Sequence, residues 1–208
     1  INVHASLLPK LRGGAPIHHA IIDGYEKTGV TIMYMSKEMD KGDIISQREI
    51  PILPSDTVSS LHDKLSILGR DLLLETLPSI LSSSNDRISQ NEDEATYGFN
   101  ISKDDEKISF DKSKRQIVNQ VRGLNCFPGA FCLLDGNVLK VFSCRRGDGI
   151  YNNALPGEIV SIYDDGFGVC VSNGEVVFTE VQPAGKRKMS ARDFINGYKG
   201  VLKGKILR

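Results

Sequence analysis

The 208-residue sequence lacks long apolar runs, paired cysteines and an excess charge of either sign. No apolar stretch approaches the ~20 residues of a membrane helix, which argues against a helical membrane protein. The first residues have neither the basic region nor the apolar core of a signal peptide. The four cysteines form no C-x-x-C pair and lie mostly in apolar segments, which favours buried thiols in a reducing compartment over disulfides. We therefore expect a cytoplasmic protein.

Metal-ligand spacing and internal repeats are also missing. None of the four histidines is spaced from a cysteine or a second carboxylate as a zinc site requires, so we expect no metal. The remaining composition, 40% hydrophobic and 25% charged, is that of an ordinary globular protein. A chain of this length forms one large or two small domains.

The zero net charge hides an asymmetry between the two halves. Residues 1–100 hold 9 Lys and Arg against 14 Asp and Glu, whereas residues 101–208 hold 17 against 12. The last 26 residues carry eight basic side chains and a single acid, Asp193. This asymmetry indicates that the second half binds a polyanion, although a basic tail in solvent would have the same composition.

The first half alternates short helices and strands. Strands are predicted at residues 1–4, 29–35 and 44–52, and a short helix at residues 15–24. A longer helix begins after Ser55 or Asp56 and runs to Pro78 or slightly past it, because apolar residues recur there at helical spacing. These elements predict an α/β layer spanning residues 1–84.

A polar segment separates this layer from a second domain. Residues 85–107 are predicted to be a linker because the region is rich in serine and acidic residues. In residues 108–208 a helix begins with the capping-box pattern at Ser113, and a last short helix begins at Ser190. Five strands are predicted between them, at residues 130–134, 138–144, 158–163, 168–172 and 176–182. This succession of short strands and turns predicts a small barrel of the OB type, which commonly binds nucleic acid.

One pair of polar residues suggests chemistry. Asn2 and His4 share one face of the first strand, which ends in a proline-containing loop and the pair Gly13-Gly14. Ligands bind at the carboxyl ends of strands in open α/β sheets, and an amide beside an imidazole could stabilise the oxyanion of an acyl transfer. A polar strand end that simply meets water would give the same pattern.

Four motifs in the first half resemble the folate-dependent formyltransferases. They are NVHASLLP at residues 2–9, RGGAPI at 12–17, TGVTI at 28–32 and MDKGD at 39–43. In the second half, VRGLNCFPGA at 121–130 and VQPAGKRKM at 181–189 resemble the carboxyl-terminal domain of methionyl-tRNA formyltransferases, which glycinamide ribonucleotide formyltransferases lack. The resemblance implies an α/β fold, in which a truncated Rossmann-like formyltransferase domain is followed by a small OB-like β-barrel.

The resemblance also implies a reaction and its residues. The family moves a formyl group from 10-formyltetrahydrofolate to the amino group of methionyl-initiator tRNA, at the start of translation. By resemblance, Asn2, His4 and Asp40 are catalytic: Asn2 and His4 would donate to the oxyanion, and Asp40 would orient His4 and help accept the amine proton. The residues expected to bind the folate are Ser6, Leu7, Leu8 and Pro9.

Family members begin with a further Rossmann-like half before the Asn-x-His strand. The resemblance therefore implies that this chain lacks the amino-terminal part of the catalytic domain and is inactive by itself; we expect a monomer. Two alternatives are an RNA-binding module with an inactive formyltransferase remnant and a formyltransferase acting on another amine, such as a sugar nucleotide. Asn2, His4 and Asp40 argue against the first alternative, and the motif at residues 182–186 with the basic tail argues against the second.

Overall fold

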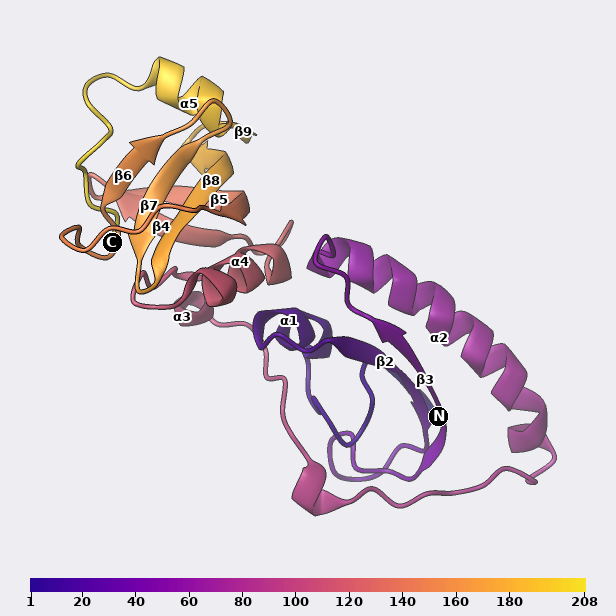
Figure 1. Cartoon of the computed structure of the whole chain (residues 1–208). Helices are drawn as coiled ribbons and strands as arrows, with labels where there is room; N and C mark the ends of the chain where they lie inside the picture. Colours follow the sequence, from indigo (N-terminus) through magenta and orange to yellow (C-terminus); the bar gives the residue numbers. More distant parts are fainter. The chain divides into compact units, whose positions relative to one another are not determined.

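The computed structural model describes all 208 residues and divides into two compact units, residues 1–101 and residues 102–208 (Figure 1). Each unit has its own sheet and its own helices. None of the helices is both long and apolar enough to cross a lipid bilayer.

The first unit is built on a three-stranded sheet. Its strands are β1 (Asn2–His4), β2 (Lys27–Met33) and β3 (Ile44–Pro51), in the order β1-β2-β3. Both pairings are antiparallel, with His4 opposite Thr31 and Thr31 opposite Gln47. The carboxyl ends of these three strands therefore do not all lie at one edge of the sheet.

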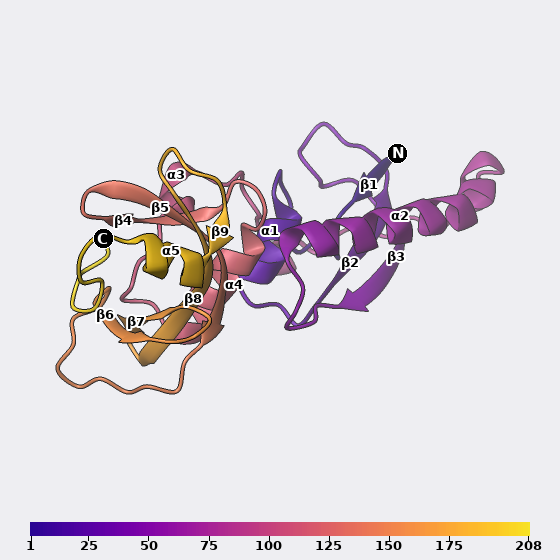
Figure 2. The ribbon, with the colours of Figure 1, turned by 90° about the horizontal axis from the view of Figure 1, so that it is seen from above.

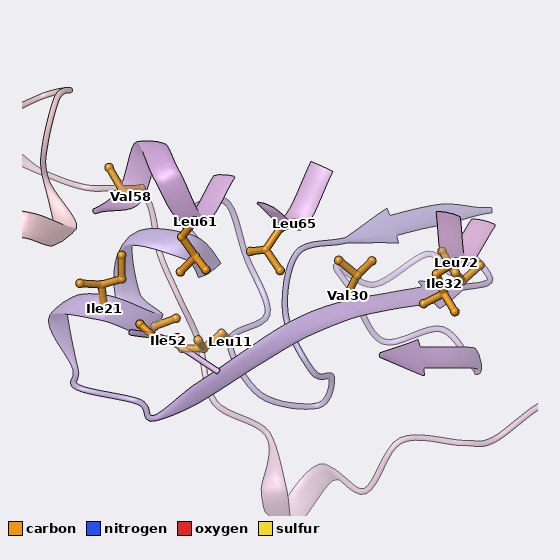
Figure 3. Close-up of a cluster of buried hydrophobic side chains, with 10 residues drawn as sticks. Leu11, Ile21, Val30, Ile32, Ile52, Val58, Leu61, Leu65 and Leu72 are labelled. Carbon is orange, nitrogen blue, oxygen red and sulfur yellow. The ribbon is translucent and has the colours of Figure 1, made fainter. Parts of the chain in front are cut away.

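Two helices complete this α/β layer. Helix α2 (Val58–Leu81) begins at Thr57, whose side chain forms a capping box with Ser60, and it continues past Pro78. Figure 2 shows α2 running along the sheet, and helix α1 (Pro16–Ile22) precedes β2. The predicted helical spacing is confirmed, because the residues on one side of α2 are buried against the sheet and α1 (Figure 3). They include Val58, Leu61, Leu65 and Leu72, packed with Ile21, Val30 and Ile32.

The segment predicted to be a linker is packed rather than free. Ile88 forms an antiparallel bridge with Ile44, and Tyr97 forms a parallel bridge with Arg12. The backbone N–H of Arg12 donates to the carbonyl of Thr96 at 2.9 Å, and the N–H of Gly98 donates to the carbonyl of Arg12 at 2.7 Å. Residues 85–101, including the short turn η1 (Glu92–Glu94), therefore belong to the first unit. Composition could not reveal this, since the contacts use backbone groups that every residue carries.

The second unit is mostly antiparallel sheet. Helices α3 (Lys103–Glu106) and α4 (Lys114–Gly123) precede the strands, and α5 (Ala191–Gly197) follows them. The strands are β4 (Ala130–Leu134), β5 (Asn137–Arg146), β6 (Ile159–Ile162), β7 (Phe167–Val171), β8 (Gly174–Pro183) and β9 (Met189–Ser190). Their order is β4-β5-β8-β7-β6, and β9 pairs with β8. The five predicted strands are all present.

The predicted barrel is not closed by its strands. Closure requires hydrogen bonds between the two end strands, and β4 does not pair with β6. Instead the last residues of the chain bond to both: Arg208 exchanges backbone bonds with Leu133 of β4, and the N–H of Ile159 in β6 donates to the carbonyl of Lys205. Leu207 is buried in this arrangement, so the basic tail is a packed segment and not an extension into solvent.

Candidate active site

His4 and Asp40, predicted from the sequence to act together, lie side by side. His4 is 6% exposed, and its Nδ1 lies 3.7 Å from Oδ1 of Asp40. Asn2 is half-buried and shares its face of β1 with His4, because alternate residues of a strand point to the same side. Val3 points the other way, toward Gly69 of α2. The three predicted catalytic residues therefore belong to one side of the sheet.

The hydrogen bond of His4 determines where its protons lie. Nε2 of His4 is 3.0 Å from the carbonyl oxygen of Leu11. A carbonyl only accepts, so Nε2 must carry a proton, and in the neutral ring Nδ1 is then the unprotonated nitrogen. Nδ1 faces the Asp40 carboxylate. This geometry suits a ring that takes up a proton at Nδ1 beside a stabilising negative charge.

The Asp40 loop is held in place by groups from two other segments. Asp40 has a left-handed backbone, with φ of 56°, which is unfavourable for a residue other than glycine. The N–H of Gly13 donates to Oδ2 of Asp40 at 2.8 Å. The side-chain amide of Gln90 donates to the backbone carbonyls of Asp40 and Gly42, at 2.7 and 2.8 Å. These bonds offset the cost of the left-handed conformation and orient the carboxylate.

Gln90 is itself held by a buried arginine. Arg12 is 0% exposed, and its Nε and Nη2 donate to Oε1 of Gln90 at 3.1 and 2.8 Å. Its two terminal nitrogens donate to the carboxylate of Glu92 at 3.0 and 2.8 Å. The hydrogen bonds that Arg12 donates to Glu92 raise the pKa of Arg12 and lower the pKa of Glu92. We name Arg12, Gln90 and Glu92 the arginine brace.

Sequence reasoning missed the arginine brace because Gln90 and Glu92 lie in the segment predicted to be a linker. One signal was available: Arg12 sits in a mostly apolar motif, and a buried guanidinium needs an acidic partner. The sequence does not say which of the 26 acidic residues supplies it.

The four residues expected to bind folate divide into two kinds. Ser6 is 1% exposed and its hydroxyl donates to the carbonyl of Lys10, whereas the Leu8 side chain is buried against Met33 and Ile44. These two side chains hold the loop from within. Leu7 and Pro9 are half-buried and leave part of their surface accessible. No cluster of three or more histidine, cysteine, aspartate or glutamate side chains is positioned to bind a metal ion.

Two of the basic residues expected to bind a polyanion already form ion pairs within the second unit. Lys188 is 3.1 Å from Glu180, and Lys205 is 2.7 Å from Asp135. The hydrogen bond that Lys205 donates to Asp135 raises the pKa of Lys205. Lys186 and Arg187 are exposed. Arg192, Lys199, Lys203 and Arg208 are exposed as well, so the second unit has exposed cations both in the β8–β9 hairpin and in the tail.

Two family models match the chain. The model "Formyl transferase" matches residues 1–77, and the model "Formyl transferase, C-terminal domain" matches residues 100–199. Together they define a formyl transferase with its carboxyl-terminal domain, and each match falls largely within one of the two units.

Similar proteins show which formyl transferases this chain belongs with. The methionyl-tRNA formyltransferase of Macrococcus caseolyticus is 48% identical over 98% of this chain, and that of Staphylococcus aureus (strain bovine RF122 / ET3-1) is 47% identical over the whole chain. The chain belongs to the methionyl-tRNA formyltransferase family. It spans 65% of the length of the Macrococcus relative and 67% of the Staphylococcus relative.

Solved structures share the fold. HypX from Aquifex aeolicus in complex with tetrahydrofolic acid matches with a TM-score of 0.71 and 18% identity, over 99% of this chain and 38% of that one. An N-formyltransferase from Helicobacter canadensis, in complex with folinic acid and dTDP-3-aminofucose, matches with a TM-score of 0.69 and 22% identity. That match covers 86% of this chain and 65% of the other.

Proposed function

We propose that this chain provides catalytic and RNA-binding parts of an enzyme that transfers a formyl group from 10-formyltetrahydrofolate to methionyl-initiator tRNA. The observation that carries this proposal is the buried His4–Asp40 pair, on the strand face that also presents Asn2. The substrate assignment follows the names of the relatives that are 47–50% identical. We place the reaction at translation initiation in the cytoplasm, and the protein acts as a monomer.

The transition state of this reaction carries charge at two positions. When a neutral amine attacks the formyl carbon, the formyl oxygen becomes negative and the amine nitrogen becomes positive. The Asn2 side chain supplies a hydrogen-bond donor for the oxygen. Such a donor is typically worth about 3–4 kcal/mol in the transition state.

The His4–Asp40 pair takes up the proton that the amine loses and returns it to the donor nitrogen, whose bond to the formyl carbon breaks as the new C–N bond forms. Because Nε2 is committed to the carbonyl of Leu11, the geometry favours His4 as a proton acceptor at Nδ1 over a donor to the oxyanion. The Asp40 carboxylate stabilises the imidazolium that results. The N–H of Gly13 and the arginine brace keep that carboxylate facing the ring.

Only two of the four residues in the 6–9 loop are placed to contact a bound folate. The bound folate supplies the formyl group. Leu7 and Pro9 offer apolar surface to it, while Ser6 and Leu8 support the loop from behind. The ligands of two structural neighbours, tetrahydrofolic acid in HypX and folinic acid in the Helicobacter canadensis N-formyltransferase, support this class of donor.

The second unit, with an OB-like sheet, binds the tRNA through its phosphates. Its net charge of +5 and the exposed Lys186 and Arg187 support this assignment.

A formylation assay tests the proposal. The protein, expressed from its complete gene, is given 10-formyltetrahydrofolate and either methionyl-initiator tRNA or a dTDP-linked amino sugar. We expect formyl transfer to the tRNA alone. Transfer to the sugar nucleotide would establish the other amine as substrate, and tRNA binding without any formyl transfer would establish an RNA-binding module with an inactive remnant.

A further inference from the structure

The loop between α4 and β4 presents an aromatic side chain to solvent. Phe127 is 78% exposed, whereas the phenylalanines of the nearby sheet, such as Phe142 and Phe178, are buried. Exposed single apolar residues are common, so exposure alone assigns no role.

Three hydrogen bonds fix the loop. The side-chain amide of Asn125 donates to the carbonyl of Phe142 at 2.8 Å, and the N–H of Gly129 donates to the carbonyl of Leu124 at 2.9 Å. The ammonium of Lys140 donates to the carbonyl of Pro128, also at 2.9 Å. Phe127 lies at the tip of a loop that is closed at both ends. Its ring is therefore displayed by a rigid support and has little freedom to fold back onto the sheet.

The support is positively charged. Lys140 bonds to the loop at the carbonyl of Pro128. The ammonium of Lys188 lies 5.3 Å from the centre of the Phe142 ring, and that ring lies next to Gly129 of the loop. Glu180 pairs with Lys188 at 3.1 Å and offsets part of this charge. The unit as a whole carries +5. An exposed aromatic ring among cations is the arrangement that binds unpaired nucleotides, because bases stack on the ring while phosphates meet the cations.

We propose that Phe127 is a base-stacking contact for an unpaired nucleotide of the RNA partner. Lys140 pairs in register with Gln182, whose side-chain amide donates to the carbonyl of Lys186 at 2.8 Å, so both lysines can bind phosphates of the same strand. This inference rests on the RNA-binding part of the proposed function and adds a mode of recognition to it. Stacking is indifferent to base identity but requires a base that is free of a duplex stack.

The absence of tryptophan from the chain permits a direct test. Phe127→Trp places a single indole at the proposed contact, and Ile150→Trp places one at a matched position in the same unit that is 79% exposed. Each variant is titrated with initiator tRNA and with a single-stranded oligouridine. We expect RNA to quench the indole emission at position 127 and to leave it unchanged at position 150. Equal quenching at both positions would overturn the contact.

Affinity provides the second measurement. Phe127→Ala is expected to weaken binding of tRNA and oligouridine about tenfold, to leave binding of a blunt RNA duplex unchanged, and to keep the salt dependence. If wild type binds tRNA and Phe127→Ala binds it equally well, the stacking contact is wrong and the proposed function stands. If wild type binds no RNA, the RNA-binding part of the proposed function fails as well. Circular dichroism of each variant verifies that it is folded.

Discussion

The side-chain amide of Gln90 bridges the backbone carbonyls of Asp40 and Gly42, 50 and 48 residues earlier in the chain. This bridge makes the segment after α2 part of the support of the candidate active site. The chain of contacts runs from the buried Arg12 through Gln90 to the Asp40 loop, and it ends at the imidazole of His4.

The first prediction concerns this bridge. Gln90→Ala removes both hydrogen bonds to the loop, so the Asp40 carboxylate should lose its fixed orientation. We expect kcat to fall roughly tenfold, about 1.4 kcal/mol of transition-state stabilisation, with little change in KM for tRNA. Asp86→Ala, an exposed change in the same segment, is the matched control. A variant that raised KM and kept kcat would show that Gln90 does not position Asp40.

The second prediction concerns the proton acceptor. Asp40→Asn preserves the size of the side chain but removes the charge that faces Nδ1 of His4. We expect kcat to fall at least about a hundredfold for Asp40→Asn and for His4→Ala, with a smaller effect on tRNA affinity. The double variant should lose little more than either single variant, because the two residues act as one unit. Additive losses in kcat would contradict the assignment.

The third prediction follows from the buried carboxylate of Glu175. Burial raises the pKa of Glu175, but hydrogen bonds from Ser161, Tyr163 and the N–H of Gly149 outweigh it, and the pKa is lowered. A lowered pKa means that the carboxylate stabilises the fold above the ordinary glutamate pKa of about 4.3. This contribution is lost as the pH falls through the lower folded value.

Urea unfolding at neutral and acid pH measures this contribution. We expect Glu175→Gln to lower the free energy of unfolding at pH 7 by about 1–3 kcal/mol, because buried donors lose a charged acceptor. The difference from wild type should shrink below about pH 4, where the wild-type carboxylate also becomes protonated. Asp148→Asn, an exposed change in the same unit, should have little effect at either pH. A difference independent of pH would show that the charge of Glu175 does not matter.

The fourth prediction separates free from paired cations. Lys186→Ala and Arg187→Ala should each weaken binding of initiator and elongator tRNAs alike and flatten the plot of log K against log salt by at most about one unit. Lys205→Ala should leave the slope unchanged, because its ammonium already pairs with Asp135. Equal slopes for all three variants and wild type would argue against phosphate binding by the hairpin.

Local patterns were readable from the sequence because they depend on neighbours in the chain. Helical spacing of apolar residues predicted α2, turn residues separated the strands of the second unit, and strand alternation placed Asn2 and His4 on one face. The pairing of His4 with Asp40 was expected from the family motifs, and the structure brings the two side chains together. Their catalytic roles remain predictions.

Tertiary structure decided what depends on contacts between distant segments. Arg12 finds Gln90 and Glu92 about 80 residues later, and only the folded chain shows that a polar, acidic segment completes the support of Asp40. The proton on Nε2 of His4 follows from a bond to the Leu11 carbonyl, a group present in every residue and so invisible in composition. The same holds for the basic tail, where backbone bonds of Ile159 with Gly204 and Lys205 hold a charged segment against the sheet. The periodicity of side chains can be read directly from the sequence. The partners of backbone groups and of buried ions depend on how the whole unit packs.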